Sequence, residues 1–236
     1  MTYCVAMRLS SGMIFVSDSR TNAGVDHISS FRKLHVFQQD NERTLVLQSA
    51  GSLATTQSVL SLLKRSCGDG STPMLMSCGS MYDAALIVGE TLREVIKRDG
   101  EEFSATLLLG GQIRGEEPRL FQIYAQGNFI EASMDTPYFQ IGESKYGKPI
   151  IDRVLRYDTP LDQAMQCALI SMDSTLASNI SVGLPLDVMM YPADSFSSAQ
   201  QHHITDKHSC FAQIRQQWSR GLLSVFSGLP PLHLDE

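Results

Sequence analysis

The sequence predicts a single α+β domain in which helices cover layers of β-sheet. Predicted elements alternate in blocks, in the order strands, two helices, strands, two helices, strand and helix. The chain has 236 residues, and 43% of them are hydrophobic, which is enough for one substantial core. No internal repeat, low-complexity linker or clear domain boundary interrupts it.

A β-hairpin is predicted first, with its turn at Ser10-Ser11-Gly12 between two short β-rich runs. The register that pairs Leu9 with Met13 makes Thr2 and Asp18 diagonal neighbours on one face, because opposed residues of an antiparallel pair share a face. A shift of one residue would break this relation.

A second hairpin is predicted over residues 32–49, with its turn at Asp40-Asn41-Glu42. Its register places Lys33 opposite about Ser49. Lys33 at the beginning of one strand and Gly51 at the end of the next should therefore lie at the same edge of the layer.

Helices and strands alternate through the rest of the chain. Ser52 is a candidate cap for a helix that carries Leu53 to Leu63. The other predicted elements are a helix over 80–97, strands over 105–109, 119–124 and 129–131, helices near 150–156 and 161–174, a strand over 186–191 and a last helix over 208–226. The last helix has one apolar face, and the prolines that follow it prevent its continuation.

Composition narrows the class of function. The formal charge of -6 includes no basic block, so nucleic acid is not expected as a partner. Neither a basic leader nor a bilayer-length apolar run is present, which predicts a cytoplasmic protein with no membrane partner. The cysteines lack CxxC spacing and are expected to be reduced thiols, mostly in the core: Cys4, Cys67, Cys78, Cys167 and Cys210.

Thr2 is the first candidate for chemistry. Removal of Met1 would leave a hydroxyl nucleophile and a free α-amine on one residue. Because the reference pKa of an α-amine is about 7.7–8.0, part of the amine is unprotonated near neutral pH and can accept the hydroxyl proton. A small residue after a start methionine is ordinary when considered alone. The interpretation of Thr2 as a nucleophile therefore depends on the other motif residues.

The order of short motifs resembles proteasome β-type subunits, which are N-terminal-nucleophile hydrolases. Thr2 is followed by Ser17-Asp18-Ser19-Arg20, Phe31-Arg32-Lys33 and Ser49-Ala50-Gly51, with Lys33 one residue earlier than the usual spacing. The stretches 17–26 and 141–149 resemble the bacterial Anbu branch, the ancestral β subunit. This resemblance implies a four-layer αββα sandwich over residues 1–236, with a C-terminal helical extension from about residue 205.

The resemblance also implies roles for the motif residues. Thr2 would attack an amide carbonyl with its α-amine as general base. Lys33 would lower the pKa of the Thr2 hydroxyl and amine, and Asp18 would keep Lys33 charged. The Gly51 amide would donate to the oxyanion. No cofactor is required, and the implied partners are a peptide or unfolded protein substrate and identical subunits in a large homo-oligomer.

Auxiliary positions are less well defined. The family has a serine after an Ile-Gly pair, but here Glu143 and then Ser144 follow that pair, so either residue is a candidate. Ser181 could supply a later auxiliary serine. Arg20 and Asp173 are supporting candidates, with a surface ion pair and a helix-end acid as the simpler interpretations.

A metal site is not expected. His202-His203, His208 and Cys210 have suitable side chains, but their spacing fits no closed zinc pattern, and a polar loop that enters the last helix is the preferred interpretation. Cys4, which would have no built-in amine base, is predicted to be a core residue.

Three functional hypotheses remain. The first is a threonine peptidase that hydrolyses peptide bonds inside a homo-oligomer. The second is a small-molecule amidase with the same chemistry, and the third is a ring-forming or scaffold protein with weak activity.

Overall fold

A computed structural model describes residues 1–22, 28–65, 75–196 and 200–231. Cys67, Leu232 and the part of the family-like stretch from Ala23 to Asp26 lie outside these residues. The described cysteines are free thiols, buried except for Cys210.

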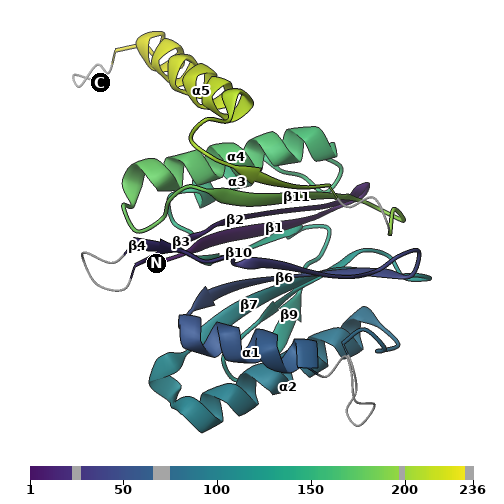
Figure 1. The fold of residues 1–236 in the computed structure, drawn as a ribbon. Helices are drawn as coiled ribbons and strands as arrows, with labels where there is room; N and C mark the ends of the chain where they lie inside the picture. The colour runs from purple at the N-terminus through teal and green to yellow at the C-terminus, as the bar shows by residue number, and fades with distance from the viewer. Residues whose placement is uncertain (23–27, 66–74, 197–199, 232–236) are drawn as a thin grey trace, which may run out of the picture.

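Two five-stranded sheets pack face to face, and helices cover both outer faces, which makes the predicted four-layer αββα sandwich (Figure 1). The first sheet has the order β10-β1-β2-β11-β12, with bounds Tyr138–Gly142, Tyr3–Leu9, Gly12–Asp18, Leu186–Pro192 and Gln200–Ile204. The second has the order β5-β6-β7-β8-β9, with bounds Leu34–Gln39, Arg43–Gly51, Ala105–Ile113, Arg119–Ile123 and Phe129–Glu131. A small separate pair joins β3 (Arg20–Asn22) to β4 (Ile28–Ser30).

Four helices form the outer layers. Helices α1 (Leu53–Arg65) and α2 (Met81–Asp99) cover the second sheet, whereas α3 (Lys148–Val154) and α4 (Leu161–Ser178) cover the first (Figure 1). A short 3-10 turn, Glu101–Phe103, connects α2 to β7. The N-terminal cap expected at Ser52 is present, since its side chain accepts a hydrogen bond from the Thr55 amide. Ser80 caps α2 in the same way and accepts from the Asp83 amide.

The register predicted for the first hairpin is wrong by one residue. Leu9 pairs with Gly12 and Cys4 with Ser17, so only Ser10 and Ser11 form the turn. Gly12 belongs to the ladder because the neighbouring strand β11 approaches it closely: a Cβ at Gly12 would lie 2.1 Å from the backbone oxygen of Tyr191. The glycine that was interpreted as a turn residue thus permits close packing of strands.

The second hairpin has the predicted register. Leu34 pairs with Gln48, and one step further the Ser49 amide donates to the Lys33 carbonyl oxygen at 3.1 Å. Lys33 and Gly51 therefore lie at the same edge of the second sheet.

Two strands of the first sheet were missed. The short strand β10 contributes only Phe139 and Ile141 as buried apolar residues. Strand β12 has four polar residues among its five, as edge strands often do, so the loop predicted around His202-His203 is wrong.

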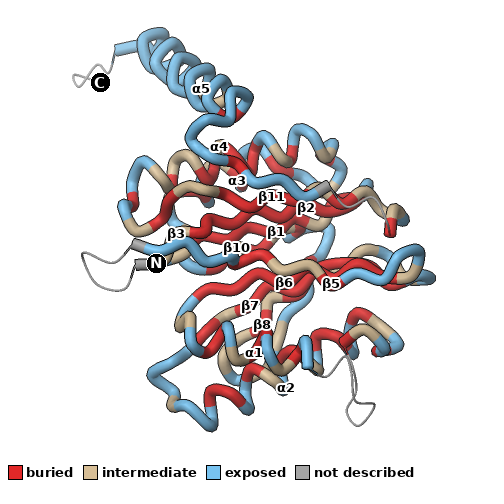
Figure 2. Tube along the Cα trace, viewed as in Figure 1, coloured by how far each residue is buried: buried red, intermediate tan, exposed pale blue. Residues whose placement is uncertain are grey.

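Three apolar clusters hold the layers together. One lies between the two sheets, and the others lie beneath the outer helices of each sheet. Figure 2 shows buried residues throughout the sheets and on the inner sides of the covering helices.

The last helix, α5 (Ser209–Ser227), projects beyond these layers (Figure 1). Phe211 near its start is the helix's buried residue, whereas most of the helix is exposed (Figure 2). None of the described helices is both long and apolar enough to span a bilayer.

Substitution of Gly12 by alanine tests the close approach of β2 and β11. We expect the free energy of unfolding to fall by about 2–4 kcal/mol, because a left-handed backbone conformation and a clash with Tyr191 act together. Urea denaturation of the Gly12→Ala variant measures this loss.

Gly115→Ala is the matched control, since Gly115 also has a positive φ but no atom lies within 4 Å of the position that a Cβ would take. We expect it to cost only about 1 kcal/mol. Equal losses for the two variants would contradict the close-approach explanation.

Candidate active site

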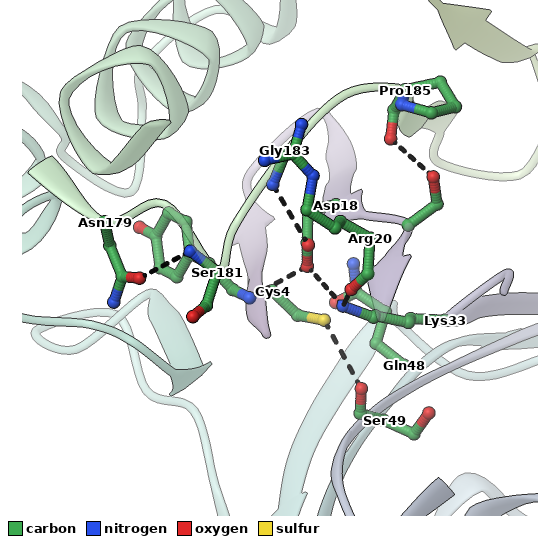
Figure 3. A network of polar contacts seen from close by, with 12 residues as sticks. Cys4, Asp18, Arg20, Lys33, Gln48, Ser49, Asn179, Ser181, Gly183 and Pro185 are labelled. Atoms are coloured by element: carbon green, nitrogen blue, oxygen red, sulfur yellow. Dashed lines mark hydrogen bonds and ion pairs between the residues drawn. The ribbon is translucent and has the colours of Figure 1, made fainter. Parts of the chain in front are cut away.

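The carboxylate of Asp18 connects the amino-terminal strand to the second sheet. Asp18 ends β2 and is fully buried. Its Oδ1 atom accepts hydrogen bonds from the Tyr3 amide at 3.0 Å and from the Lys33 ammonium at 2.8 Å, and its Oδ2 atom accepts from the Gly183 amide at 3.4 Å (Figure 3). Asp18 therefore fixes the residue after Thr2 and the lysine together, although the predicted register was shifted.

The Lys33 ammonium is held by two oxygen acceptors on neighbouring segments. Lys33 precedes β5, is 6% exposed, and donates from Nζ to the Arg20 carbonyl oxygen at 2.6 Å as well as to Asp18 (Figure 3). Two short hydrogen bonds to oxygen atoms leave the ammonium little freedom to move.

Burial raises the pKa of the Asp18 carboxyl above its ordinary value, against the opposing effects of the Lys33 ammonium and of the Tyr3 and Gly183 amides. The carboxylate form consequently depends on its cation. Loss of either partner would leave a buried group without compensation.

The backbone of Thr2 is held by the end of β10. The Glu143 amide donates to the Thr2 carbonyl oxygen at 2.7 Å. Gly142 has a φ of 82°, and a Cβ on it would lie 1.9 Å from that same oxygen. A residue with a side chain at position 142 would displace Thr2. This steric limit explains why glycine is needed in the Ile-Gly pair.

One open cavity of about 470 Å³ is lined by three of the predicted catalytic residues, Thr2, Lys33 and Gly51. Its walls come from the start of β1, the segment before β5, and the junction of β6 with α1. Gly51 has a φ of 118°, and a Cβ there would lie 2.5 Å from the Ser104 carbonyl oxygen, so β7 also passes close to this wall. The volume is in the range of pockets that bind small ligands or peptide side chains.

The Arg20 side chain contacts the loop that precedes β11. Its guanidinium donates to the Ile180 carbonyl oxygen at 2.9 Å and packs against Gly183, where a Cβ would lie 2.1 Å from the Arg20 Cζ atom. Arg20 thus acts on the loop before β11 (Figure 3). The simple surface ion pair between Arg20 and Asp18 is not formed; Asp18 pairs with Lys33 instead.

The auxiliary positions converge on Glu143 and on Asn179, which the sequence reasoning missed. The buried Glu143 carboxylate accepts a hydrogen bond from the Asn179 amide group at 2.8 Å and pairs with Lys145 at 3.3 Å. The Asn179 oxygen accepts from the Ser181 amide at 2.9 Å (Figure 3). Its place at the end of α4, two residues before a candidate serine, was the available signal.

The serine side chains contribute less to this network. No hydrogen bond joins the hydroxyl of Ser144 or Ser181 to the described residues, and neither residue lines the cavity. Both serines are bonded through their backbones: the Ser144 amide donates to the Gly142 oxygen and its carbonyl oxygen accepts from the Lys148 amide, and the Ser181 amide donates to Asn179.

Asp173 and the histidines lie elsewhere. Asp173 sits within α4 and forms an ion pair with Arg215 of α5, so the structure does not bring it to the cavity. His203 pairs with the buried Asp187 at 2.9 Å, and His208 caps α5. Within the described ranges no group of three or more potential ligands is arranged to hold a metal ion.

Cys4 is a core residue, as predicted. It is fully buried in β1, and its thiol donates to the Ser49 carbonyl oxygen at 3.7 Å (Figure 3). Burial raises the pKa of the Cys4 thiol, which makes it a poor nucleophile.

The chain matches one protein family and several solved structures. A family model described as proteasome subunit matches residues 2–188. The chain is similar to "Anbu (ancestral beta-subunit) from Yersinia bercovieri", with 71% identity, a TM-score of 0.96, and coverage of 99% of this chain and 100% of the other.

The chain is also similar to two further solved Anbu structures. "Helical Assembly of the Anbu Complex from Pseudomonas aeruginosa" is 50% identical, with a TM-score of 0.94 and 98% of each chain covered. An Anbu (Gly-1) mutant from Hyphomicrobium sp. strain MC1 is 46% identical, with a TM-score of 0.95 and coverage of 99% of this chain and 100% of that one. A separate comparison with curated proteins found no match.

Replacement of Lys33 by methionine tests the buried ion pair. It leaves Asp18 without a cation, and we expect the free energy of unfolding near pH 7 to fall by about 3–5 kcal/mol. Aspartate in the unfolded chain has a pKa of about 3.9, and the folded variant retains its Asp18 proton to higher pH. The loss should therefore be small below pH of about 4 and should grow as the pH rises through the interval between these two pKa values.

Urea denaturation between about pH 4 and 8 measures this dependence. The control is the double variant Asp18→Asn/Lys33→Met, which removes both charges and should show a flatter profile and recover part of the stability. A loss in Lys33→Met that does not change with pH would contradict the buried-pair explanation.

Proposed function

The chain belongs to the proteasome subunit family and, within it, to the Anbu proteins, and on this premise we propose that it is a threonine peptidase with Thr2 as its nucleophile. The observation that carries the proposal is the buried pair of Lys33 and Asp18, which are held 2.8 Å apart beside a cavity lined by Thr2. The Asp18 carboxylate also binds the amide of Tyr3, so the cation and the start of β1 are fixed relative to one another.

Cleavage of the Met1–Thr2 bond supplies the base. It frees the Thr2 α-amine, which accepts the hydroxyl proton as the Thr2 oxygen forms a bond to the substrate carbonyl carbon. The Lys33 ammonium stabilises negative charge that develops on the hydroxyl oxygen. Since Asp18 and the Arg20 carbonyl hold the ammonium in advance, no reorganisation is needed at the moment of reaction.

The carbonyl oxygen becomes an oxyanion, for which the Gly51 amide is the proposed donor. When this intermediate collapses, the peptide C–N bond breaks and the departing amine takes the proton from the Thr2 ammonium. Water then attacks the resulting ester with the same amine as base, releases the carboxylic acid and restores Thr2.

We assign a positioning role to Glu143 and Asn179. Glu143 binds the Thr2 carbonyl oxygen through its backbone, and Asn179 holds its carboxylate. This arrangement favours Glu143 over Ser144 for the auxiliary position. The substrates proposed are peptides and unfolded proteins in the cytoplasm.

Self-assembly is the second part of the proposal. The similar Anbu complex from Pseudomonas aeruginosa is described as a helical assembly. In this chain α5 and the residues after it carry exposed apolar side chains that a neighbouring subunit could cover: Leu222, Leu223, Val225, Phe226 and Leu229. The same observation favours an assembling scaffold as the alternative function, whereas no contact specific to a small-molecule amide favours an amidase.

Substitution of Thr2 separates the peptidase from the scaffold. We expect Thr2→Ala to reduce hydrolysis of fluorogenic peptides and unfolded casein by about 10³-fold or more, because the nucleophile is lost. Thr2→Ser keeps a hydroxyl and is the matched control that should retain measurable turnover. Undiminished turnover in Thr2→Ala would refute the assignment, and unchanged light scattering of that variant shows that assembly persists.

Charge on the apolar face of α5 tests self-assembly. We expect the Leu223→Lys/Phe226→Lys variant to lower the mass measured by light scattering, since two ammonium groups cannot be buried against a second subunit. Ser224→Lys is the control, because Ser224 lies on the opposite, polar side of the same helix. Assemblies of unchanged mass in the double variant would exclude this face as an interface.

A further inference from the structure

The charges around the Thr2 cavity are unbalanced. Its lining includes two cationic side chains, Arg32 and Lys33, and no carboxylate. Thr21, Ser49 and Thr56 line the remaining wall together with apolar residues, among them Ala50 and Leu53. The charged part of this lining favours an anionic group in a substrate.

The two cations differ in what they can offer a ligand. Lys33 is buried and its charge is neutralised by Asp18 at 2.8 Å. Arg32 is exposed, and its guanidinium forms no ion pair or hydrogen bond with the residues that the structure describes. Its five N–H donors are therefore available to a group that enters the cavity.

We propose that this cavity selects substrates in which the residue that contributes the scissile carbonyl has an acidic side chain, and that Arg32 is the specificity-determining residue. The inference rests on the proposed peptidase function. Thr2 and the proposed oxyanion donor Gly51 line the same cavity as Arg32, so a side chain next to the attacked carbonyl would enter the cavity that Arg32 lines. Guanidinium and carboxylate match in planar, bidentate geometry.

The expected size of the preference for glutamate depends on the solvent exposure of Arg32. Exposed ion pairs contribute less than buried ones because solvent screens them. We therefore expect kcat/KM for a peptide with glutamate at this position to exceed that for the glutamine analogue by about tenfold at low salt. The difference should shrink as ionic strength rises.

The test compares fluorogenic peptides that differ only in this residue, as glutamate, glutamine or lysine. Arg32→Gln should abolish the preference for glutamate over glutamine, and Arg32→Glu should favour lysine. Arg153→Gln, an exposed arginine on α3 outside the cavity, is the matched control and should keep the preference.

Binding measured without turnover separates this inference from the proposed function. In the Thr2→Ala variant, fluorescence anisotropy of labelled peptides should show tighter binding of the glutamate peptide, and Arg32→Gln should remove the difference. Equal kcat/KM and equal binding for glutamate and glutamine peptides would overturn the acidic preference even if peptides are cleaved. If no peptide is cleaved but the Arg32-dependent binding difference persists, the peptidase proposal fails and the acidic binding subsite stands.

Discussion

The buried ion pair between Asp18 and Lys33 is the interaction on which the site depends, because it joins the two sheets at the edge where Thr2 emerges. Asp18 ends a strand of the first sheet, and Lys33 precedes a strand of the second. Removing two charges from water costs free energy that their attraction barely offsets, so such a pair contributes little net stability. Its geometric consequence is larger: hydrogen bonds from Tyr3 and Gly183 and to the Arg20 carbonyl fix both charges beside the cavity.

A close backbone approach beside this pair restricts position 142 to glycine. Gly142 permits the contact with the Thr2 carbonyl oxygen, whereas Gly183 packs against the guanidinium of the Arg20 side chain. The loop with Asn179 and Gly183 therefore contacts three parts of the site: Asp18, Arg20 and the Glu143 carboxylate. We interpret this loop as the support that keeps the cation, the start of β1 and the end of β10 in one arrangement, while α5 remains outside the sandwich.

Local patterns predicted elements better than pairings. The second hairpin was predicted correctly because its turn residues, Asp40-Asn41-Glu42, lie outside both strands and define the register. The first was not, because the role of Gly12 depends on Tyr191, which is distant in sequence. The polar strand β12 has no apolar alternation to detect. Motif spacing predicted that Thr2, Lys33 and Gly51 share an edge. The contact of Asn179 with Glu143 and the distance of Asp173 from the cavity could not be predicted, because they depend on how loops and helices pack.

The central claim is that Thr2 acts as an amino-terminal nucleophile beside this fixed ammonium. The most direct test is intact-mass analysis of the protein before and after reaction with a peptide epoxyketone, which bonds to both the hydroxyl and the α-amine of such a residue. The account predicts a chain that lacks Met1 and gains the mass of one inhibitor, with the adduct mapped to Thr2. A chain with a confirmed free Thr2 that remains unmodified would contradict it.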